Sequence, residues 1–255
     1  MTRISRPFPH IRCGASPCSG FEACVLTRVC SLLFKGESHD VVTFPSPAMM
    51  EGPPLPPLPG IKVGLDGERM VEMIRPLDVE GGEISIKSRL IGIHKRGTGA
   101  SVETEAILSD SKGPCYRIVS GAFLVGAKDF ADSGTTNSEA VEVPKRPADK
   151  EVVVKTEETM PLLFRLSGDY NPLHVEEGLA AMSGFEKPIL HGLCNLGIST
   201  KTVLKEMLDN DPNAFKLVKA RFASPVLPGQ HLVIKMWRQG DRGTPLCLRA
   251  RTLRG

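Results

Sequence analysis

Aromatic residues are scarce in this chain: they make up 5% of its 255 residues, with one tryptophan and two tyrosines. The net charge is also small, +3, and no block of lysine or arginine is interleaved with aromatic residues. Nucleic-acid binding depends on such basic surfaces and stacking platforms, so nucleic acid is not expected as a partner. A weak positive balance still suits a small anionic ligand, because a few basic side chains suffice to bind phosphates.

The chain also lacks a run of about 18 apolar residues, so no membrane-spanning helix is expected. Its seven cysteines include no Cys-x-x-Cys pair, which argues against a zinc site. The sequence has no clear secretory signal, which argues against a secreted disulfide scaffold. We therefore expect a globular protein of a reducing compartment that holds no metal.

The first 33 residues do not resemble a folded core. Residues 1–33 carry four arginines against one acidic residue, Glu22. This pattern predicts a transit-type leader, a peroxisomal signal around Arg3-Ile4 and His10-Ile11, or a disordered or wrongly assigned start. A proline-rich stretch at 45–60 predicts a polyproline spacer, with a ligand for SH3-type domains as the alternative.

A first folded unit is expected over residues 34–130. Four runs rich in β-branched residues, separated by turns that contain glycine or proline, predict antiparallel strands. These runs are Met70–Ile74, Ile84–Ile93, Ser101–Leu108 and Tyr116–Val125. The polar stretch 131–150 predicts a linker to a second unit.

The second unit, residues 151–255, is expected to contain strands around one long helix. Apolar residues at helical spacing predict this helix over 192–208, and a shorter helix is predicted near 176–183. Strands are predicted at Val152–Lys155, Lys216–Phe222, His231–Trp237 and Pro245–Ala250. A wholly β unit followed by strands around a helix predicts an α+β fold with two similar halves.

An acid, an amide and an imidazole lie within six positions of one another, at Asp169, Asn171 and His174. Pro172 blocks regular helix pairing and favours a turn. A carboxylate and an imidazole on one short turn form a proton-transfer pair that can hold one water. Taken singly, Asp169 fits a turn-capping residue and His191 a helix-start residue, but their joint order favours a chemical site.

The sequence Ser-Gly-Asp-x-Asn-Pro-Leu-His at 167–174, followed by Pro-Ile-Leu-His-Gly-Leu at 188–193, resembles the signature of a known family. This family is the MaoC-like (R)-specific 2-enoyl-CoA hydratases, the hydratase 2 group, which includes the hydratase unit of peroxisomal multifunctional enzyme type 2. The resemblance runs from about 34 to 240. It implies a double hot-dog fold, with an antiparallel sheet around a helix in each half, a degenerate N-terminal half and a catalytic C-terminal half.

The resemblance implies an activity and roles for individual residues. Members reversibly hydrate trans-2-enoyl-CoA to (3R)-3-hydroxyacyl-CoA in fatty acid β-oxidation. Asp169 and His174 would share the catalytic water, and Asn171 would hold their geometry. The backbone N–H of Gly192, at a helix N-terminus, would donate to the thioester carbonyl as it gains enolate charge. The implied substrate contacts are Tyr170, Pro172, Leu173, Phe222, Gly67 and Arg96, so that both halves would build one site.

The resemblance implies neither a metal nor a redox cofactor, because the CoA thioester is itself the substrate. A non-catalytic acyl-CoA-binding or scaffold hot dog, and an acyl-CoA thioesterase, are the alternative functions. The peroxisome is the expected location, with the cytosol and the mitochondrion as alternatives, and a homodimer is compatible with the sequence. The match fades after Gly240, so the last strand of the second half is expected to be missing.

Overall fold

The computed structural model describes residues 2–4, 53–77, 83–139, 142–167, 169–239 and 246–252, with the side chains of 2–4 and 246–249 excepted. These residues form two compact units. Unit 1 comprises residues 2–4, 53–77, 83–139 and 215–223. Unit 2 comprises residues 142–167, 169–214, 224–239 and 246–252.

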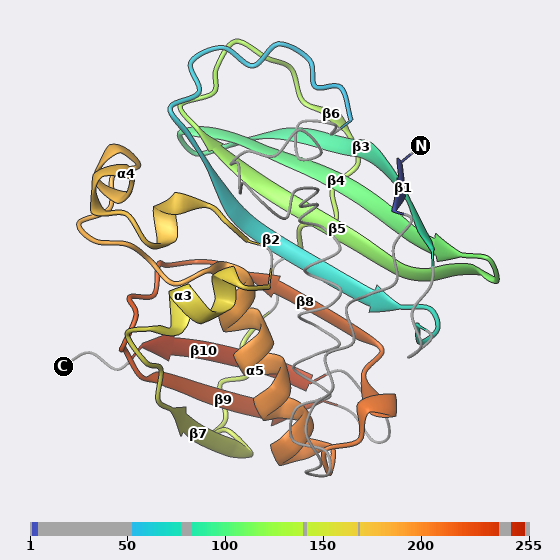
Figure 1. Cartoon of the computed structure of the whole chain (residues 1–255), viewed down its shortest axis with the longest axis vertical. Helices are drawn as coiled ribbons and strands as arrows, with labels where there is room; N and C mark the ends of the chain where they lie inside the picture. Colours follow the sequence, from blue (N-terminus) through green and yellow to red (C-terminus); the bar gives the residue numbers. More distant parts are fainter. Residues whose placement is uncertain are drawn as a thin grey trace. The chain divides into compact units, whose positions relative to one another are not determined.

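Unit 1 is one antiparallel sheet of seven strands in the order β1-β3-β4-β5-β2-β8, with β6 paired to β3 (Figure 1). The strands are β1 (Thr2–Ile4), β2 (Val63–Met73), β3 (Ile84–Arg96), β4 (Gly99–Asp110), β5 (Gly113–Val125), β6 (Ser133–Gly134) and β8 (Leu217–Arg221). Two-residue turns join β3 to β4 and β4 to β5. Gly97, with a φ of 47°, supplies the left-handed conformation that such a turn favours. The predicted β pattern of this region is confirmed.

Strand β2 begins at Val63, earlier than the predicted start at Met70. Glycines and charged residues weaken the β pattern there, but pairing with β5 on one side and β8 on the other forms the strand. A bulge interrupts the pairing with β5 at Gly67. A Cβ on Gly67 would lie 3.0 Å from the carbonyl oxygen of Gly121, so a side chain there would crowd the neighbouring strand.

The two faces of the sheet in unit 1 differ in chemistry because side chains alternate along β4. Val102 lies in an apolar cluster with Ile93, Ala100 and Ala127. The acids Glu103 and Glu105, which point to the opposite face, are buried as well. Buried carboxylates require partners, and the partners of Glu105 are two arginines. Hydrogen bonds from Arg89 and Arg117, led by that from Arg89, hold the pKa of Glu105 below its usual value.

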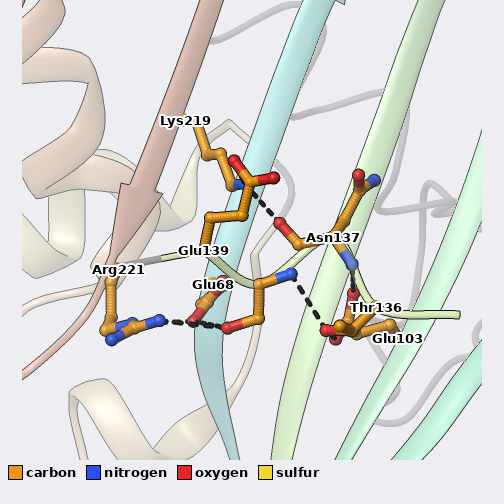
Figure 2. Close-up of polar contacts among 8 residues, drawn as sticks. Glu68, Glu103, Thr136, Asn137, Glu139, Lys219 and Arg221 are labelled. Atoms are coloured by element: carbon orange, nitrogen blue, oxygen red, sulfur yellow. Dashed lines mark hydrogen bonds and ion pairs between the residues drawn. The ribbon is translucent and has the colours of Figure 1, made fainter. Parts of the chain in front are cut away.

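Residues 132–139, which we call the strap, cross this polar face from β3 toward β8. Thr136 Oγ1 and the backbone N–H of Asn137 each donate to the carboxylate of Glu103 at 2.6 Å (Figure 2). Contacts further along the strap reach β2 and β8: Ser138 Oγ donates to Glu68, and Lys219 Nζ donates to the carbonyl oxygen of Asn137. Glu103 is therefore the central anchor of the strap.

Replacing Glu103 with leucine should release the strap and lower the free energy of unfolding by about 2–4 kcal/mol, because two strap donors lose a charged acceptor. Urea denaturation measures this difference. The matched control is Glu139→Gln, since Glu139 has an 85% exposed side chain lying 3.9 Å from Lys219 Nζ. Exposed pairs of this kind contribute little, so the control should melt like the unmodified chain. Equal effects of the two substitutions would contradict the role of Glu103.

Unit 2 combines a three-stranded antiparallel sheet, in the order β10-β9-β7, with short helices and one long helix. Its elements are β7 (Lys150–Val154), α3 (Met160–Arg165), η1 (Pro172–His174), α4 (Glu177–Met182), α5 (Gly192–Met207), η2 (Pro212–Ala214), β9 (Leu232–Arg238) and β10 (Leu246–Thr252). Helix α5 lies against the sheet (Figure 1). Their shared core holds Met207, Leu232, Ile234 and Met236. Helices α4 and α5 confirm the two predicted helices.

The end of α5 also follows the prediction. Asp209 and Asn210 adopt φ values of 50° and 60°, the left-handed conformation that turns a chain out of a helix. The backbone N–H of Asn210 donates to the carbonyl oxygen of Leu204, which satisfies one of the last helical acceptors. Helix α3 was not predicted.

One predicted strand has an unexpected partner. Lys216–Phe222, grouped by sequence with residues 151–255, forms β8 and pairs with β2 in unit 1. A strand pattern indicates which residues alternate, not which neighbour they pair with.

Of residues 1–33 only Thr2–Ile4 are described, and of 45–60 only 53–60, so the predictions for the rest lie outside the described residues. The helix expected in the first half is not among the described residues of unit 1. No helix within the described ranges is both long and apolar enough to cross a membrane.

Candidate active site

The turn that carries Asp169, Asn171 and His174 is built by two successive side-chain-to-backbone hydrogen bonds. Asp169 Oδ1 accepts from the backbone N–H of Asn171 at 3.2 Å, and Asn171 Oδ1 accepts from that of Leu173 at 3.1 Å. Pro172, at the first position of η1, has the φ angle that such a start favours. These local bonds direct Asp169 and His174 into the interior, where both are buried. Asn171 therefore acts on the geometry of the pair through the backbone.

The ring of His174 has a fixed tautomer. Its Nδ1 lies 2.7 Å from the carbonyl oxygen of Ile189. Because a carbonyl oxygen can only accept, Nδ1 carries the proton and Nε2 of the neutral ring keeps a lone pair. Burial lowers the pKa of His174, while the Ile189 carbonyl and Asp169 act in the opposite direction. His174 is therefore suited to accept a proton through Nε2.

His191 joins this pair, although sequence reasoning gave it no chemical role. Its ring stacks on that of His174 with the centroids 3.7 Å apart and the planes inclined by 27°. Its Nε2 lies 3.9 Å from Asp169 Oδ2, too far for a hydrogen bond. Phe164 covers another side of the ring, at 4.7 Å between centroids. Only 1% of His191 is exposed.

His191 occupies the N-cap position of α5, but its side chain makes no capping hydrogen bond. Serine, threonine, aspartate and asparagine are the usual N-cap residues. A histidine at this position was therefore the one feature of the sequence that could have indicated a role for His191 other than capping. Gly192 follows as the first residue of α5. The first N–H groups of a helix have no acceptor within it and carry its positive dipole end. The backbone N–H of Gly192 is therefore suited to stabilise a developing negative charge.

The remaining predicted site residues fall into two groups. Tyr170, Pro172 and Leu173 are half-buried on the turn of Asp169, and the Arg165 guanidinium lies 5.6 Å from the centre of the Tyr170 ring. In unit 1, Phe222 follows β8 and donates its backbone N–H to the carbonyl oxygen of Gly67 at 2.8 Å. Arg96 is exposed at the end of β3.

One ligand atom from each of Asp169, His174 and His191 lies within 4.8 Å of the others, so a metal ion must be considered. Ligands about 2.1 Å from a tetrahedral zinc ion are about 3.4 Å apart, closer than the 3.9 Å between His191 Nε2 and Asp169 Oδ2. The arrangement therefore fits a water better than a metal.

Comparison with known proteins shows which chains this one is similar to. The MaoC-like domain matches residues 139–246. Peroxisomal multifunctional enzyme type 2 of Mus musculus is 39% identical over 202 residues, covering 76% of this chain and 27% of that enzyme. The peroxisomal enoyl-CoA hydratase 2 of Arabidopsis thaliana is 34% identical over 200 residues, covering 72% and 64%. The chain thus spans less than two thirds of these relatives.

A solved structure extends the similarity to the fold. The crystal structure of a MaoC-like dehydratase from Phytophthora capsici superimposes with a TM-score of 0.77 at 35% identity, covering 89% of this chain and 76% of that one. The similarity supports the α+β double hot-dog fold that the sequence resemblance implied, except that the helix expected in the first half is not among the described residues of unit 1. The turn of Asp169 and His174, the start of α5 and the matched relatives together show that the chain belongs to the MaoC-like family.

Proposed function

We propose that this protein is an (R)-specific enoyl-CoA hydratase, which adds water to trans-2-enoyl-CoA and gives (3R)-3-hydroxyacyl-CoA in fatty acid β-oxidation. The observation that carries the proposal is the buried group of Asp169 and His174 beside the N-terminus of α5. Relatives named as hydratases, one of them the Arabidopsis enzyme, support the same substrate class. The reaction requires no metal or redox cofactor.

The chemistry needs only one water and one proton carrier. The water oxygen bonds to C3 while Nε2 of neutral His174 takes one of its protons, and Asp169 accepts a hydrogen bond from the other. The π electrons of the C2–C3 bond move toward the thioester, whose oxygen gains enolate charge opposite the N–H of Gly192. The His174 imidazolium then returns its proton to C2. Both parts of the water are added to the substrate, the hydroxyl at C3 and a proton at C2, and Asp169 and His174 return to their initial protonation states.

The substrate contacts and the location belong to the same proposal. We assign Tyr170, Pro172 and Leu173 of unit 2 to acyl-CoA binding. For Gly67, Arg96 and Phe222 of unit 1, the family resemblance alone supports a contact with the substrate. The hydrogen bond between Phe222 and Gly67 supports treating those two as one contact region. Relatives named as peroxisomal support a peroxisomal location for this protein.

One assay separates the proposal from its alternatives. Incubation with trans-2-decenoyl-CoA should reduce the absorbance of the conjugated enoyl group while the free thiol concentration stays constant. Thiol release would identify a thioesterase instead. Binding of the thioester without loss of either signal would identify a non-catalytic acyl-CoA-binding protein. Either of these outcomes would overturn the proposed function.

A further inference from the structure

His191 is a polar side chain without a polar partner. Neither of its ring nitrogens has a hydrogen-bond partner among the described residues, although only 1% of the residue is exposed. An unsatisfied buried polar group costs about 1–3 kcal/mol, and a phenyl ring would fill similar space without that cost. Buried polar atoms of this kind require an explanation, and a ligand absent from the free protein is one.

The position of His191 indicates what that ligand is. One ligand atom from each of Asp169, His174 and His191 lies within 4.8 Å of the other two. A triangle with no side longer than 4.8 Å fits inside a circle of radius 4.8/√3. One point therefore lies no farther than about 2.8 Å from all three atoms. That distance is a normal hydrogen bond to a water oxygen. The gap of 3.9 Å between His191 Nε2 and Asp169 Oδ2 is too long for a direct bond but is spanned by one bridging water.

The low pKa of His191 gives the two stacked histidines different roles. Burial, and then the neighbouring His174, lower the pKa of His191 to about 3. The backbone carbonyl of Asp169 acts in the opposite direction, although it does not meet the geometry of a hydrogen bond to the ring. His191 is therefore neutral wherever His174 works, and it does not compete for the proton of the water. A neutral imidazole can still donate or accept one hydrogen bond.

We propose that His191 is a third catalytic residue, which makes a hydrogen bond to the water shared by Asp169 and His174 and so orients it for attack on C3. This inference rests on the proposed hydratase function, because the water has a task only if an enoyl thioester is bound. The inference requires a hydrogen-bonding nitrogen at position 191, and not merely a ring that packs on His174. It can therefore be tested by substitution.

The test uses the full chain and three substitutions assayed with trans-2-decenoyl-CoA. His191→Asn and His191→Leu have side chains of nearly equal size, both lack the ring, and only the asparagine can hydrogen-bond. His191→Phe keeps a ring for the stack on His174 but has no nitrogen. The asparagine variant should retain a kcat at least about tenfold above that of the leucine variant, with similar KM. The phenylalanine variant should lose about tenfold or more in kcat while melting close to the unmodified chain.

Each result decides the matter. A phenylalanine variant with unchanged kcat, or a leucine variant as fast as the asparagine variant, would overturn the inference and leave His191 a packing residue. If neither apolar variant folds while the asparagine variant does, the nitrogens serve stability, and the inference also fails. An unmodified chain that hydrates no enoyl-CoA would overturn the proposed function itself, a result that needs no variant and is therefore distinguishable.

Discussion

Asp169→Asn should lower kcat for hydration of trans-2-decenoyl-CoA by at least about 100-fold, the usual contribution of a positioned acid–base group. The amide has nearly the shape of the carboxylate, and its oxygen can still accept from the backbone N–H of Asn171. The turn should therefore form as before. What is lost is the negative charge that accepts a hydrogen bond from the water and stabilises the His174 imidazolium. Initial rates from the enoyl absorbance measure the loss.

Asp211→Asn is the matched control for this substitution. Asp211 Oδ1 accepts from the backbone N–H of Asn213 at 2.9 Å, which is the same local turn in an exposed position of unit 2. This variant should keep the full rate. A near-normal rate for Asp169→Asn, or an equal loss in the control, would contradict the role given to Asp169.

His174→Gln should lower kcat by a similar or larger factor, at least about 100-fold, because the variant loses the imidazole that takes the water proton. The stacked His191 cannot replace it, since a pKa of about 3 makes His191 too weak a base. The glutamine amide can still donate to the carbonyl oxygen of Ile189, so the segment before α5 keeps its anchor. The variant loses the ring stacked on His191, which should lower its stability by about 1 kcal/mol without unfolding it. Rate and thermal melt are measured together.

The pH dependence tests the same residue without substitution. His174 must be neutral to accept a proton, and its pKa lies below the ordinary value of 6.5 because burial disfavours the charged ring. The unmodified chain should therefore keep its kcat/KM down to pH 6.5 and lose it only at lower pH, as the ring becomes protonated. His94→Gln is the control, since His94 also contacts a backbone carbonyl, that of Thr135, outside the site. An acid limb centred at or above pH 6.5 would contradict this assignment.

The parts of the site that depend on local sequence could be predicted. The Asx turns of Asp169 and Asn171 span two residues each, and Pro172 fixes the backbone between them. The apolar spacing of α5 likewise gave both the helix and its start at Gly192. Local hydrogen bonds and the periodic burial of a helix can be recognised in the sequence, because both depend on the types and spacing of residues close together in the chain.

The parts that depend on pairing across the chain could not be predicted. The carbonyl oxygen of Ile189, which fixes the tautomer of His174, belongs to the backbone and so leaves no side-chain signal. His191 matched a helix-start residue until the fold brought its ring against His174. The same holds in unit 1, where a strand pattern did not specify that β8 pairs with β2. Neither Glu103 nor the strap has a local pattern, because the contact joins residues 33 and 34 positions apart.

Hydration in deuterium oxide tests the central claim most directly. Asp169 and His174 lie close enough together to act on one water, so the account requires the hydroxyl and the C2 proton to reach the same face of the planar enoyl thioester. The account predicts a (3R)-3-hydroxyacyl-CoA with one deuterium at C2, in a single configuration, on the face that received the hydroxyl. A product with mixed configuration at C2, with deuterium on the opposite face, or with no hydroxyl at C3 would contradict it.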